Sequence, residues 1–408
     1  MALRMRRACL RAVAQVQAQH RGVVTSCAAA SAGGSAPSKS PPNLELHRWS
    51  EGLRHGLPKF SGLATFFRQR FSETLEGVDV ALVGVPFDGG ANHPGTRLGP
   101  REIRNKSSVV RRVNQATGVA PFDTCAVADV GDAWVSRPYA VSPSEPTDGL
   151  RSSHDEIQAF FAAVAAAGAT PVTAGGVRGG ALSSACFSSL FAHPPDSGPT
   201  RQDHSISLPI LRALRAAVGR PLAMVHLDAH CDTAPPDEVG AATGSRYPNY
   251  TPFSCAVEEG LLDPSRVIQI GIRGPTSTGR MLSRDFGFRV VEMEEFYDEG
   301  ARKVGALARS LVGDTPCYVT FDVDALDPAY ALGTGSPEDG GLTTLEAQLV
   351  LRSLRGSRVV GTDFVCCSPV WDPTGNTPRV AAVMMFEQLC LVAEARQKFG
   401  NPFAAKDK

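Results

Sequence analysis

The sequence predicts an α/β fold, a parallel sheet with helices on both of its faces, and two observations support this prediction. Short apolar runs of strand length alternate along the chain with longer amphipathic runs of helix length, which is the order of elements in parallel α/β proteins. Acidic side chains follow two of the apolar runs, and sites in such sheets lie beyond the carboxyl ends of the strands. A chain of 408 residues with 43% hydrophobic content is long enough for one large domain or two ordinary ones.

Six apolar runs are predicted to form buried strands, and four further segments are predicted to form helices. The first helix begins with Pro100, which fits a first turn because its missing N–H is not needed there, and the second helix ends at Gly168. The predicted strands are Val78–Pro86, Ala126–Val130, Leu222–Leu227, Arg266–Arg273, Cys317–Asp324 and Arg358–Val365. The predicted helices are Pro100–Lys106, Asp155–Ala167, Ile206–Val218 and Gly300–Val312.

The stretch Val225–Asp232, Val-His-Leu-Asp-Ala-His-Cys-Asp, has three polar side chains just after a predicted strand. Asp228, His230 and Asp232 are spaced two residues apart, so in extended backbone all three point to one face. One Asp alone can cap a helix, and one His alone can be a hydrogen-bonded core residue. Three such side chains on one face make a poor core, because buried carboxylates without partners are destabilising. The stretch therefore indicates a cation site.

A second apolar run ends in acids with the same spacing, at Asp322 and Asp324, and His204 lies near the start of a predicted helix. Four carboxylates and two imidazoles suit hard or borderline divalent ions, and no cysteine pair has the spacing of a zinc ribbon. One ion rarely recruits four acids. The sequence therefore predicts two Mn²⁺ ions that share carboxylates, with a shared hydroxide as the nucleophile.

These motifs resemble those of the arginase/agmatinase (ureohydrolase) family, and most of all its mitochondrial agmatinase and guanidino acid hydrolase branch. The similarity extends from about Val78 to Cys390 and includes Asp228-Ala-His-Cys-Asp, Phe321-Asp-Val-Asp-Ala-Leu-Asp-Pro, Arg97-Leu-Gly-Pro, Gln269-Ile-Gly-Ile-Arg and Gly333-Thr-Gly-Ser-Pro-Glu. The resemblance implies a single three-layer α/β/α domain with a binuclear manganese centre. It also implies hydrolysis of a guanidino compound, agmatine or a guanidino acid, to urea and an amine, by a homo-oligomer (a trimer or hexamer).

The same resemblance implies roles for six residues. One Mn²⁺ ion would be bound by His204, Asp228, Asp232 and Asp322, and the other by Asp228, His230, Asp322 and Asp324. Asp232 would also orient the hydroxide that attacks the guanidinium carbon.

Two positions depart from the family pattern. Asn249 stands where the family has a proton-shuttling histidine, and no histidine occurs between Cys231 and Phe253. Because Asn does not titrate, we expect the loss of an acid–base contribution of about 10²-fold or more. Cys366 stands where the family has the glutamate that binds the guanidinium, a charge-assisted contact worth about 1.5–3 kcal/mol.

Cys366 and its neighbour Cys367 are interpreted as two small buried thiols, because adjacent residues of a strand point to opposite faces and no base accompanies them. The departures leave two alternatives to guanidine hydrolysis. One is a metal-binding protein without this activity, a scaffold or modulating subunit that assembles with an active relative. The other is a hydrolase of a neutral amide or amidine.

Residues 177–202 interrupt a segment that is continuous in the family pattern, in which Thr170–Gly176 should run directly into Asp203-His204-Ser205. The inserted residues are rich in Ser, Gly and Pro and are predicted to be a loop. Val177 and Gln202 have codons that can carry the boundary letters of an intron. Our hypothesis is a retained in-frame intron, which transcript sequencing tests.

Residues 1–44 are predicted to be a mitochondrial transit peptide and linker, because they contain several arginines and no acid occurs before Glu45. This predicts a location in the mitochondrial matrix, and ten cysteines without a framework spacing agree with a reducing compartment. The hydrolase domain is predicted over residues 57–396. His93, in a loop near the site, is predicted to be a surface residue and not a ligand.

The charge balance bears on the partners. Lys and Arg number 41, as do Asp and Glu, which argues against a nucleic-acid partner. No apolar run is long enough to span a bilayer. The predicted partner is a small guanidino substrate.

Overall fold

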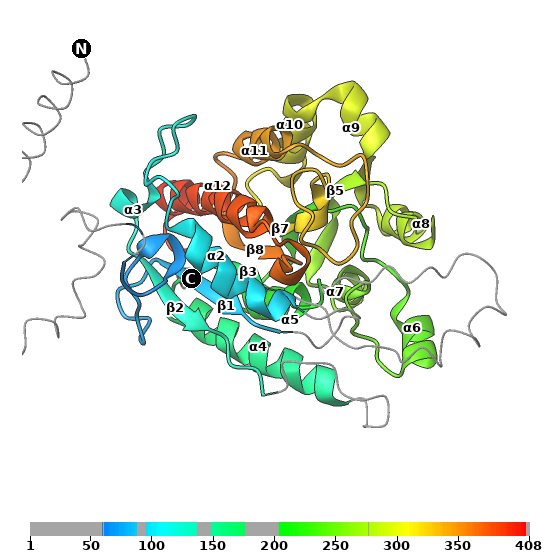
Figure 1. The fold of residues 1–408 in the computed structure, drawn as a ribbon. Helices are drawn as coiled ribbons and strands as arrows, with labels where there is room; N and C mark the ends of the chain where they lie inside the picture. Colours follow the sequence, from blue (N-terminus) through cyan, green and yellow to red (C-terminus); the bar gives the residue numbers. More distant parts are fainter. Residues whose placement is uncertain are drawn as a thin grey trace, which may run out of the picture. The chain divides into compact units, whose positions relative to one another are not determined.

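A sheet of eight parallel strands forms the centre of the fold in the computed structural model (Figure 1), which describes residues 59, 61–87, 95–136, 148–175, 204–275 and 277–404. The strands lie in the order β2-β1-β3-β8-β7-β4-β5-β6. They are β1 Val80–Val85, β2 Val127–Asp132, β3 Thr170–Gly175, β4 Leu222–Leu227, β5 Leu262–Ile272, β6 Arg289–Glu292, β7 Cys317–Asp322 and β8 Val359–Val365. The predicted parallel sheet is confirmed.

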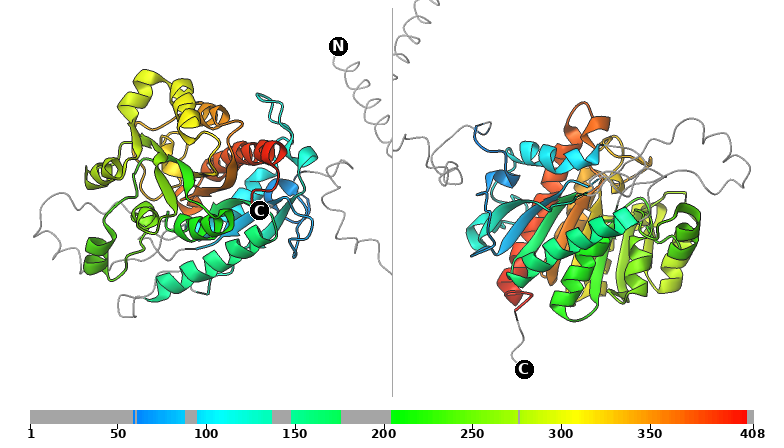
Figure 2. Two further views of the ribbon diagram at one scale, coloured as in Figure 1. Left: turned by 180° about the vertical axis from the view of Figure 1, so that it is seen from behind. Right: turned by 90° about the horizontal axis from the view of Figure 1, so that it is seen from below.

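Helices cover both faces of this sheet (Figures 1 and 2). One layer contains α2 (Gly99–Ser107), α12 (Asn376–Phe399), α11 (Thr344–Ser353) and α10 (Ala301–Val312), each in contact with the next. The other layer contains α4 (Asp148–Ala166), α5 (Ser207–Val218) and α7 (Pro252–Glu258), which also contact one another in turn. Shorter helices are α3 Pro121–Thr124, α6 Pro236–Thr243, α8 Ser277–Phe286 and α9 Met293–Glu299.

The predicted elements agree with the structure in type and place, although some of their ends differ. Helix α4 begins earlier than predicted, at Asp148, and β7 ends at Asp322, two residues before the predicted end. Several elements were not among those predicted, namely β3, the four-residue strand β6, and helices α3, α6, α7, α8, α9, α11 and α12. Helix α12 is buried along most of its surface and so lacks the polar stripe that marks an amphipathic helix.

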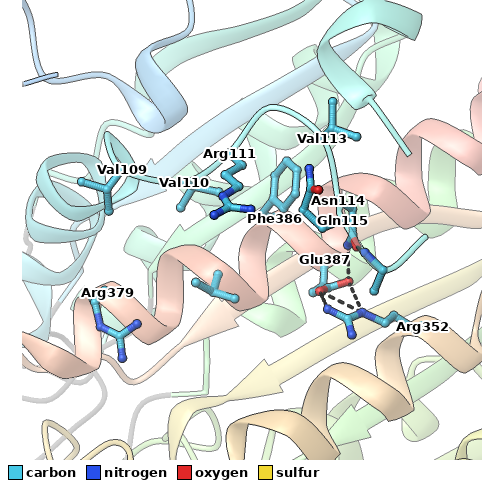
Figure 3. Close-up of a pocket in the computed structure, with 12 residues that line it drawn as sticks. Val109, Val110, Arg111, Val113, Asn114, Gln115, Arg352, Arg379, Phe386 and Glu387 are labelled. Atoms are coloured by element: carbon cyan, nitrogen blue, oxygen red, sulfur yellow. Dashed lines mark hydrogen bonds and ion pairs between the residues drawn. The ribbon is translucent and has the colours of Figure 1, made fainter. Parts of the chain in front are cut away.

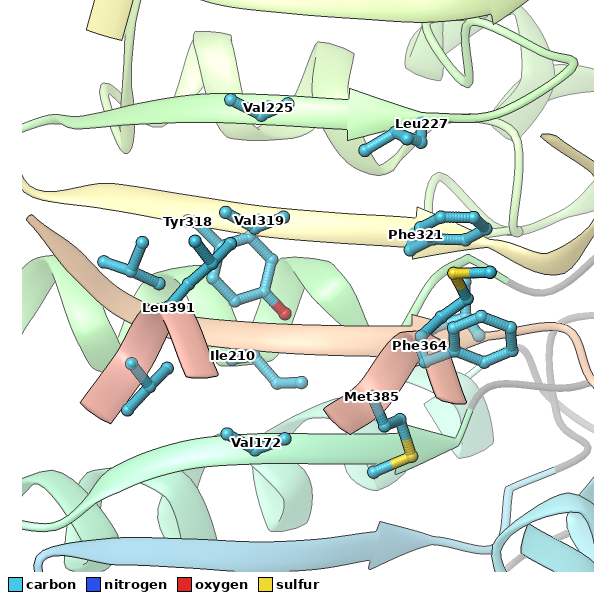
Figure 4. Close-up of a cluster of buried hydrophobic side chains, with 14 of the residues drawn as sticks. Val172, Ile210, Val225, Leu227, Tyr318, Val319, Phe321, Phe364, Met385 and Leu391 are labelled. Atoms are coloured by element: carbon cyan, nitrogen blue, oxygen red, sulfur yellow. The ribbon is translucent and has the colours of Figure 1, made fainter. Parts of the chain in front are cut away.

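The core fixes the level at which the central strands end. Figure 4 shows Phe321 on β7 and Phe364 on β8, whose rings stack with centroids 5.1 Å apart. These two residues are paired in the sheet register, and the next pair is Asp322 with Val365. The packing therefore holds Asp322 beside the point where the chain leaves β8 and continues to Cys366.

The predicted transit peptide (residues 1–44), His93 and the predicted insertion (residues 177–202) lie outside the described residues. Within the described part of the chain, no helix is both long and apolar enough to cross a membrane.

Candidate metal centre

The two central strands β4 and β7 bring the first acids together. They are neighbours in the sheet, with Leu227 paired to Phe321, so Asp228 and Asp322 follow at the same level. His204 enters from the segment just before α5 and is fully buried. All six predicted ligands meet at this edge of the sheet.

One half of the cluster is centred on His204. Its Nδ1 lies 3.0 Å from Asp228 Oδ2, 3.2 Å from Asp232 Oδ2 and 3.6 Å from Asp322 Oδ2. Its Nε2 lies 2.5 Å from the hydroxyl of Thr320 on β7, which fixes the plane of the ring. The Nδ1 edge therefore faces three carboxylates.

The other half is centred on His230. Its Nδ1 lies 3.0 Å from Asp324 Oδ2 and 3.5 Å from Asp228 Oδ1. Asp228 thus turns one oxygen to each imidazole and connects the two halves. Ligand atoms of Asp228, His230 and Asp324 lie within 4.8 Å of one another.

The backbone reaches this arrangement by a route different from the predicted one. Strand β4 ends at Leu227, and Asp232 has a φ of 52°, so Asp228, His230 and Asp232 do not share one face of extended backbone. The prediction of strict alternation is wrong, although the side chains do converge. Asp324 likewise lies in a 3₁₀ turn, Val323–Ala325, whose backbone N–H at Asp324 donates to Asp322 Oδ1 at 3.0 Å. The orientation of these carboxylates is therefore set by hydrogen-bonded turns and not by the alternation of side chains along a strand.

The electrostatics of the cluster favour a bound cation. Burial raises the pKa of Asp322 well above its usual range, and the charges of Asp324 and Asp228 raise it further. Burial and the charge of Asp228 raise the pKa of Asp324 to about 7, and they also raise the pKa of Asp232. For Asp228, burial opposes ionisation, but His226, His204 and His230 hold its pKa well below its usual range. Asp232, Asp322 and Asp324 therefore lack enough nearby positive charge to stabilise their ionised forms.

Buried atoms without hydrogen bonds agree with this electrostatic picture. Among the described residues, Asp322 Oδ2 is buried and makes no hydrogen bond, and the buried Asp324 Oδ2 has only the ion-pair contact with His230 Nδ1 at 3.0 Å. Such atoms are costly unless something absent from the protein itself satisfies them. Carboxylate oxygens and imidazole nitrogens are the donors that Mn²⁺ accepts, so the residues present fit the predicted ions.

His226 belongs to the cluster, and sequence reasoning missed it. It is fully buried, and its Nε2 lies 2.7 Å from Asp228 Oδ2. The amide of Gln269 on β5 donates to its Nδ1 at 3.1 Å and to the Cys231 carbonyl at 2.7 Å. The signal was present, because His226 precedes Asp228 by two residues, and the sequence predicted extended backbone here, in which two such side chains point to one face.

Glu338 is a second residue that sequence reasoning did not place in the site. Its Oε1 lies 3.5 Å from His230 Nε2, and its side chain is 24% exposed. The guanidinium of Arg273 holds the loop, because it donates to the Glu338 carbonyl at 2.7 Å and to the Asp324 carbonyl at 2.6 Å. Nothing in the spacing of the sequence connects Glu338 with His230, since the contact depends on this loop.

Cys366 lies at the edge of the acid cluster. It follows the end of β8 with a φ of 66°, so the expectation that Cys366 and Cys367 point to opposite faces of a strand does not apply. Both side chains are buried. Burial raises the pKa of the Cys366 thiol well above its usual range, and the charge of Asp322 raises it further. The thiol is therefore neutral near pH 7.

Asn249 is buried, with 2% of its surface exposed, and its Oδ1 makes no hydrogen bond among the described residues. The segment after it packs behind the cluster, because the ring of Phe253 lies 5.1 Å from that of His204 and 4.6 Å from that of His226. Helix α6 precedes Asn249 in the chain, and α7 follows it.

A separate pocket of about 380 Å³ contains none of the predicted site residues (Figure 3). It lies between the segment after α2 and helices α11 and α12. Its buried carboxylate, Glu387, is already paired with Arg352 and with the amide of Asn114 at 2.7 Å. The one carboxylate of this pocket is therefore already paired, and its other charged lining residues are arginines, so the pocket does not compete with the acid cluster as a metal site.

Comparisons with known proteins agree with the geometry. The family model of the Arginase family matches residues 78–185 and 203–390, and its interruption falls inside the predicted insertion. A guanidinopropionase of Pseudomonas aeruginosa is 44% identical over 342 residues, which cover 83% of this chain and 94% of the relative. A mitochondrial agmatinase of Gallus gallus is 40% identical over 334 residues, which cover 81% and 86%. The solved structure of proclavaminate amidino hydrolase from Streptomyces clavuligerus is 33% identical, with a TM-score of 0.70, and the match covers 83% of this chain and 100% of that one.

Proposed function

We propose that this chain, which belongs to the arginase family, uses two Mn²⁺ ions to hydrolyse a small guanidino compound to urea and an amine. The observation that carries this proposal is the buried acid cluster, in which Asp322 has an oxygen without a hydrogen bond and both Asp322 and Asp324 have raised pKa values. The names of the guanidinopropionase and the agmatinase support the guanidino substrate.

The proposed ligands follow the two halves of the cluster. One ion would be held by His204, Asp228, Asp232 and Asp322, and the other by Asp228, His230, Asp322 and Asp324. Bound ions of this kind supply a water that is ionised near neutral pH. Asp232 orients that water toward the guanidinium carbon. The carbon–oxygen bond forms and the carbon–nitrogen bond to the substrate chain breaks, while the proton that remains on the attacking oxygen passes to the leaving nitrogen, which gives urea and an amine.

The cellular location and the oligomeric state of the protein are also proposals. The arginine-rich N-terminus and the mitochondrial agmatinase at 40% identity support the mitochondrial matrix. A homo-oligomer is proposed from the family resemblance.

Urea release by the full-length chain loaded with Mn²⁺ tests the proposal, with agmatine, 3-guanidinopropionate and 4-guanidinobutyrate as substrates. We expect urea from at least one compound, and none from the Asp322→Asn variant, because that change removes a proposed shared ligand.

The Cys366→Glu variant separates a weak substrate contact from a missing metal centre. We expect it to increase kcat/KM about 10-fold or more, since it adds a charge-assisted acceptor. If neither the native chain nor this variant releases urea while Mn²⁺ stays bound, guanidine hydrolysis is wrong and the metal-binding alternatives gain support.

A further inference from the structure

A guanidino substrate carries a planar cation, and most carboxylates of this site are buried and already face histidines. Recognition of guanidinium requires a charged and preferably bidentate acceptor. Cys366 does not supply one, because its side chain ends in a single sulfur atom and lacks the two acceptor oxygens of a carboxylate. Asp228, Asp232, Asp322 and Asp324 are each at most 8% exposed and face the histidines of the cluster. They are assigned to the metal ions.

Among the described carboxylates in contact with the histidines of the cluster, Glu338 is the one that is not enclosed. Its side chain is 24% exposed, so a molecule that enters from solvent reaches it before the buried acids. Its separation from His230 Nε2, 3.5 Å, exceeds the normal hydrogen-bond range, and that nitrogen makes no hydrogen bond among the described residues. The carboxylate oxygens therefore retain lone pairs for another donor.

The loop that carries Glu338 is held firmly against the cluster. The Arg273 guanidinium donates to six backbone carbonyls, among them those of Glu338 at 2.7 Å, Asp324 at 2.6 Å and Gly271 at 3.0 Å. This contact ties the Glu338 loop to the turn that carries a proposed ligand and to the end of β5. A carboxylate positioned in this way loses little entropy when it binds a ligand.

We propose that Glu338 is the anionic acceptor for the substrate guanidinium in this chain. This inference rests on the proposed function, because it assumes that the substrate carries a guanidinium. The glutamate takes the place of a charge that Cys366 cannot provide, and it binds the cation beside the His230 half of the cluster.

A different role for Glu338 is to orient the His230 ring. Carboxylates often accept a hydrogen bond from the distal nitrogen of a metal-binding histidine, and their loss weakens metal binding. The Glu338→Gln variant distinguishes the two roles. Glutamine keeps an acceptor oxygen for the imidazole and removes only the negative charge.

The test measures binding of guanidinium chloride at millimolar concentration to Mn²⁺-loaded, full-length protein by calorimetry. Tetramethylammonium, a cation without N–H donors, is the matched ligand. Asp339→Asn is the matched variant, because it removes the same charge from the neighbouring exposed residue. Metal content is measured for every sample, and urea release gives KM and kcat separately.

We expect Glu338→Gln to weaken guanidinium binding about 10-fold or more, with Mn²⁺ content unchanged, and to raise KM more than it lowers kcat. Asp339→Asn should bind guanidinium as the native chain does, and tetramethylammonium should not distinguish the variants. Unchanged guanidinium affinity in Glu338→Gln overturns the inference, as does a loss of affinity that accompanies a loss of Mn²⁺.

The outcome also separates this inference from the proposed function. If the native chain and Glu338→Gln release urea equally, the hydrolase proposal stands and the role of Glu338 is wrong. If no urea forms but guanidinium binding depends on Glu338, the binding role stands and hydrolysis fails. A native chain that does not bind guanidinium overturns the inference.

Discussion

At the scale of single residues, Asp228 connects the two halves of the candidate centre. Its Oδ2 lies 3.0 Å from His204 Nδ1 and its Oδ1 accepts the backbone N–H of His230 at 2.6 Å. His226 fixes the orientation of this carboxylate by donating a hydrogen bond from its Nε2 to Asp228 Oδ2. That donation requires the tautomer in which Nδ1 is the acceptor, and the Gln269 amide selects it.

The Gln269→Leu variant should weaken Mn²⁺ binding about 10-fold or more. Without the amide, His226 is free to adopt the other tautomer, which would place a lone pair against Asp228 and disturb a proposed shared ligand. Calorimetric titration of the metal-free protein with Mn²⁺ measures the change. Gln348→Leu on α11 is the matched control, because it removes an amide far from the cluster. Equal Mn²⁺ affinity in both variants would show that His226 does not orient Asp228.

The residue types of the site were predictable, but their neighbours were not. Closely spaced acids and histidines after apolar runs are costly without a ligand, which made Asp228 and Asp322 candidates from sequence alone. Glu338 lies in a loop whose position depends on Arg273, and no local pattern encodes that contact. The same is true of Gln269, which reads as one polar residue within an apolar strand.

At the scale of elements, helix α4 presents a fully buried histidine beside the site. His154 Nε2 lies 3.2 Å from the Ser205 hydroxyl, and its ring packs near those of Phe87 and Tyr247. Burial lowers the pKa of His154 to about 3, and the charge of Arg212 lowers it further. The folded protein therefore keeps this ring neutral at pH values where the unfolded chain protonates it.

The consequence is a loss of stability in acid. The free energy of unfolding contributed by His154 is fully present above about pH 6.5 and falls as the pH decreases toward 3, because only the unfolded chain binds the proton. At about 1.4 kcal/mol per pH unit, the loss reaches about 2 kcal/mol at pH 5. Between pH 7 and pH 5 we expect the free energy of unfolding of the native chain to fall by about 2 kcal/mol more than that of the His154→Gln variant.

Urea unfolding with a chelator present measures this difference without interference from metal. His154→Phe serves as a second variant, since it removes the titrating group together with the contact to Ser205. If all three proteins lose the same free energy of unfolding between pH 7 and pH 5, His154 is not the group responsible.

Elements were predictable where their pattern is local. Strands β4, β7 and β8 are short apolar runs with clear ends, and they agree with the structure. Helix α12 is buried nearly all round, so it has no periodic polar face to detect. The turns after β4 and β7 were missed because they depend on side-chain hydrogen bonds, such as the Asp324 carboxylate accepting the Ala229 N–H at 3.0 Å.

At the scale of the whole molecule, the strand order creates the site. Strands β3, β8, β7 and β4 lie side by side, so segments distant in sequence end at one edge of the sheet (Figure 1). Periodicity alone does not give strand order, because every buried parallel strand has a similar apolar pattern. The family resemblance implied a parallel sheet in a three-layer domain, and the order of the strands comes from the structure. The resulting concentration of buried acids affects the stability of the entire fold.

Mn²⁺ should therefore stabilise the protein in a way that depends on Asp322. An ion that binds only the folded state adds about 2.7 kcal/mol when its free concentration is 100 times its Kd. We expect the Tm of the native chain at pH 8 to rise by several degrees when Mn²⁺ replaces a chelator. The Asp322→Asn variant should gain less, because it lacks one carboxylate of the cluster.

The same variant should reverse the order of stability when metal is removed. At pH 8 the unfolded chain ionises Asp322 freely, whereas burial and repulsion from Asp324 and Asp228 oppose its ionisation in the metal-free folded chain, which raises its pKa and destabilises the folded state. A neutral amide of nearly the same shape relieves this repulsion. Metal-free Asp322→Asn should thus unfold at a higher temperature than the metal-free native chain, and the loaded variant at a lower temperature than the loaded native chain. Thermal unfolding of the native chain and the Asp322→Asn variant, each with and without Mn²⁺, measures this reversal of the order of Tm values. If the Asp322→Asn variant is less stable than the native chain both with and without Mn²⁺, contacts within the protein stabilise the acids and a bound cation is not required.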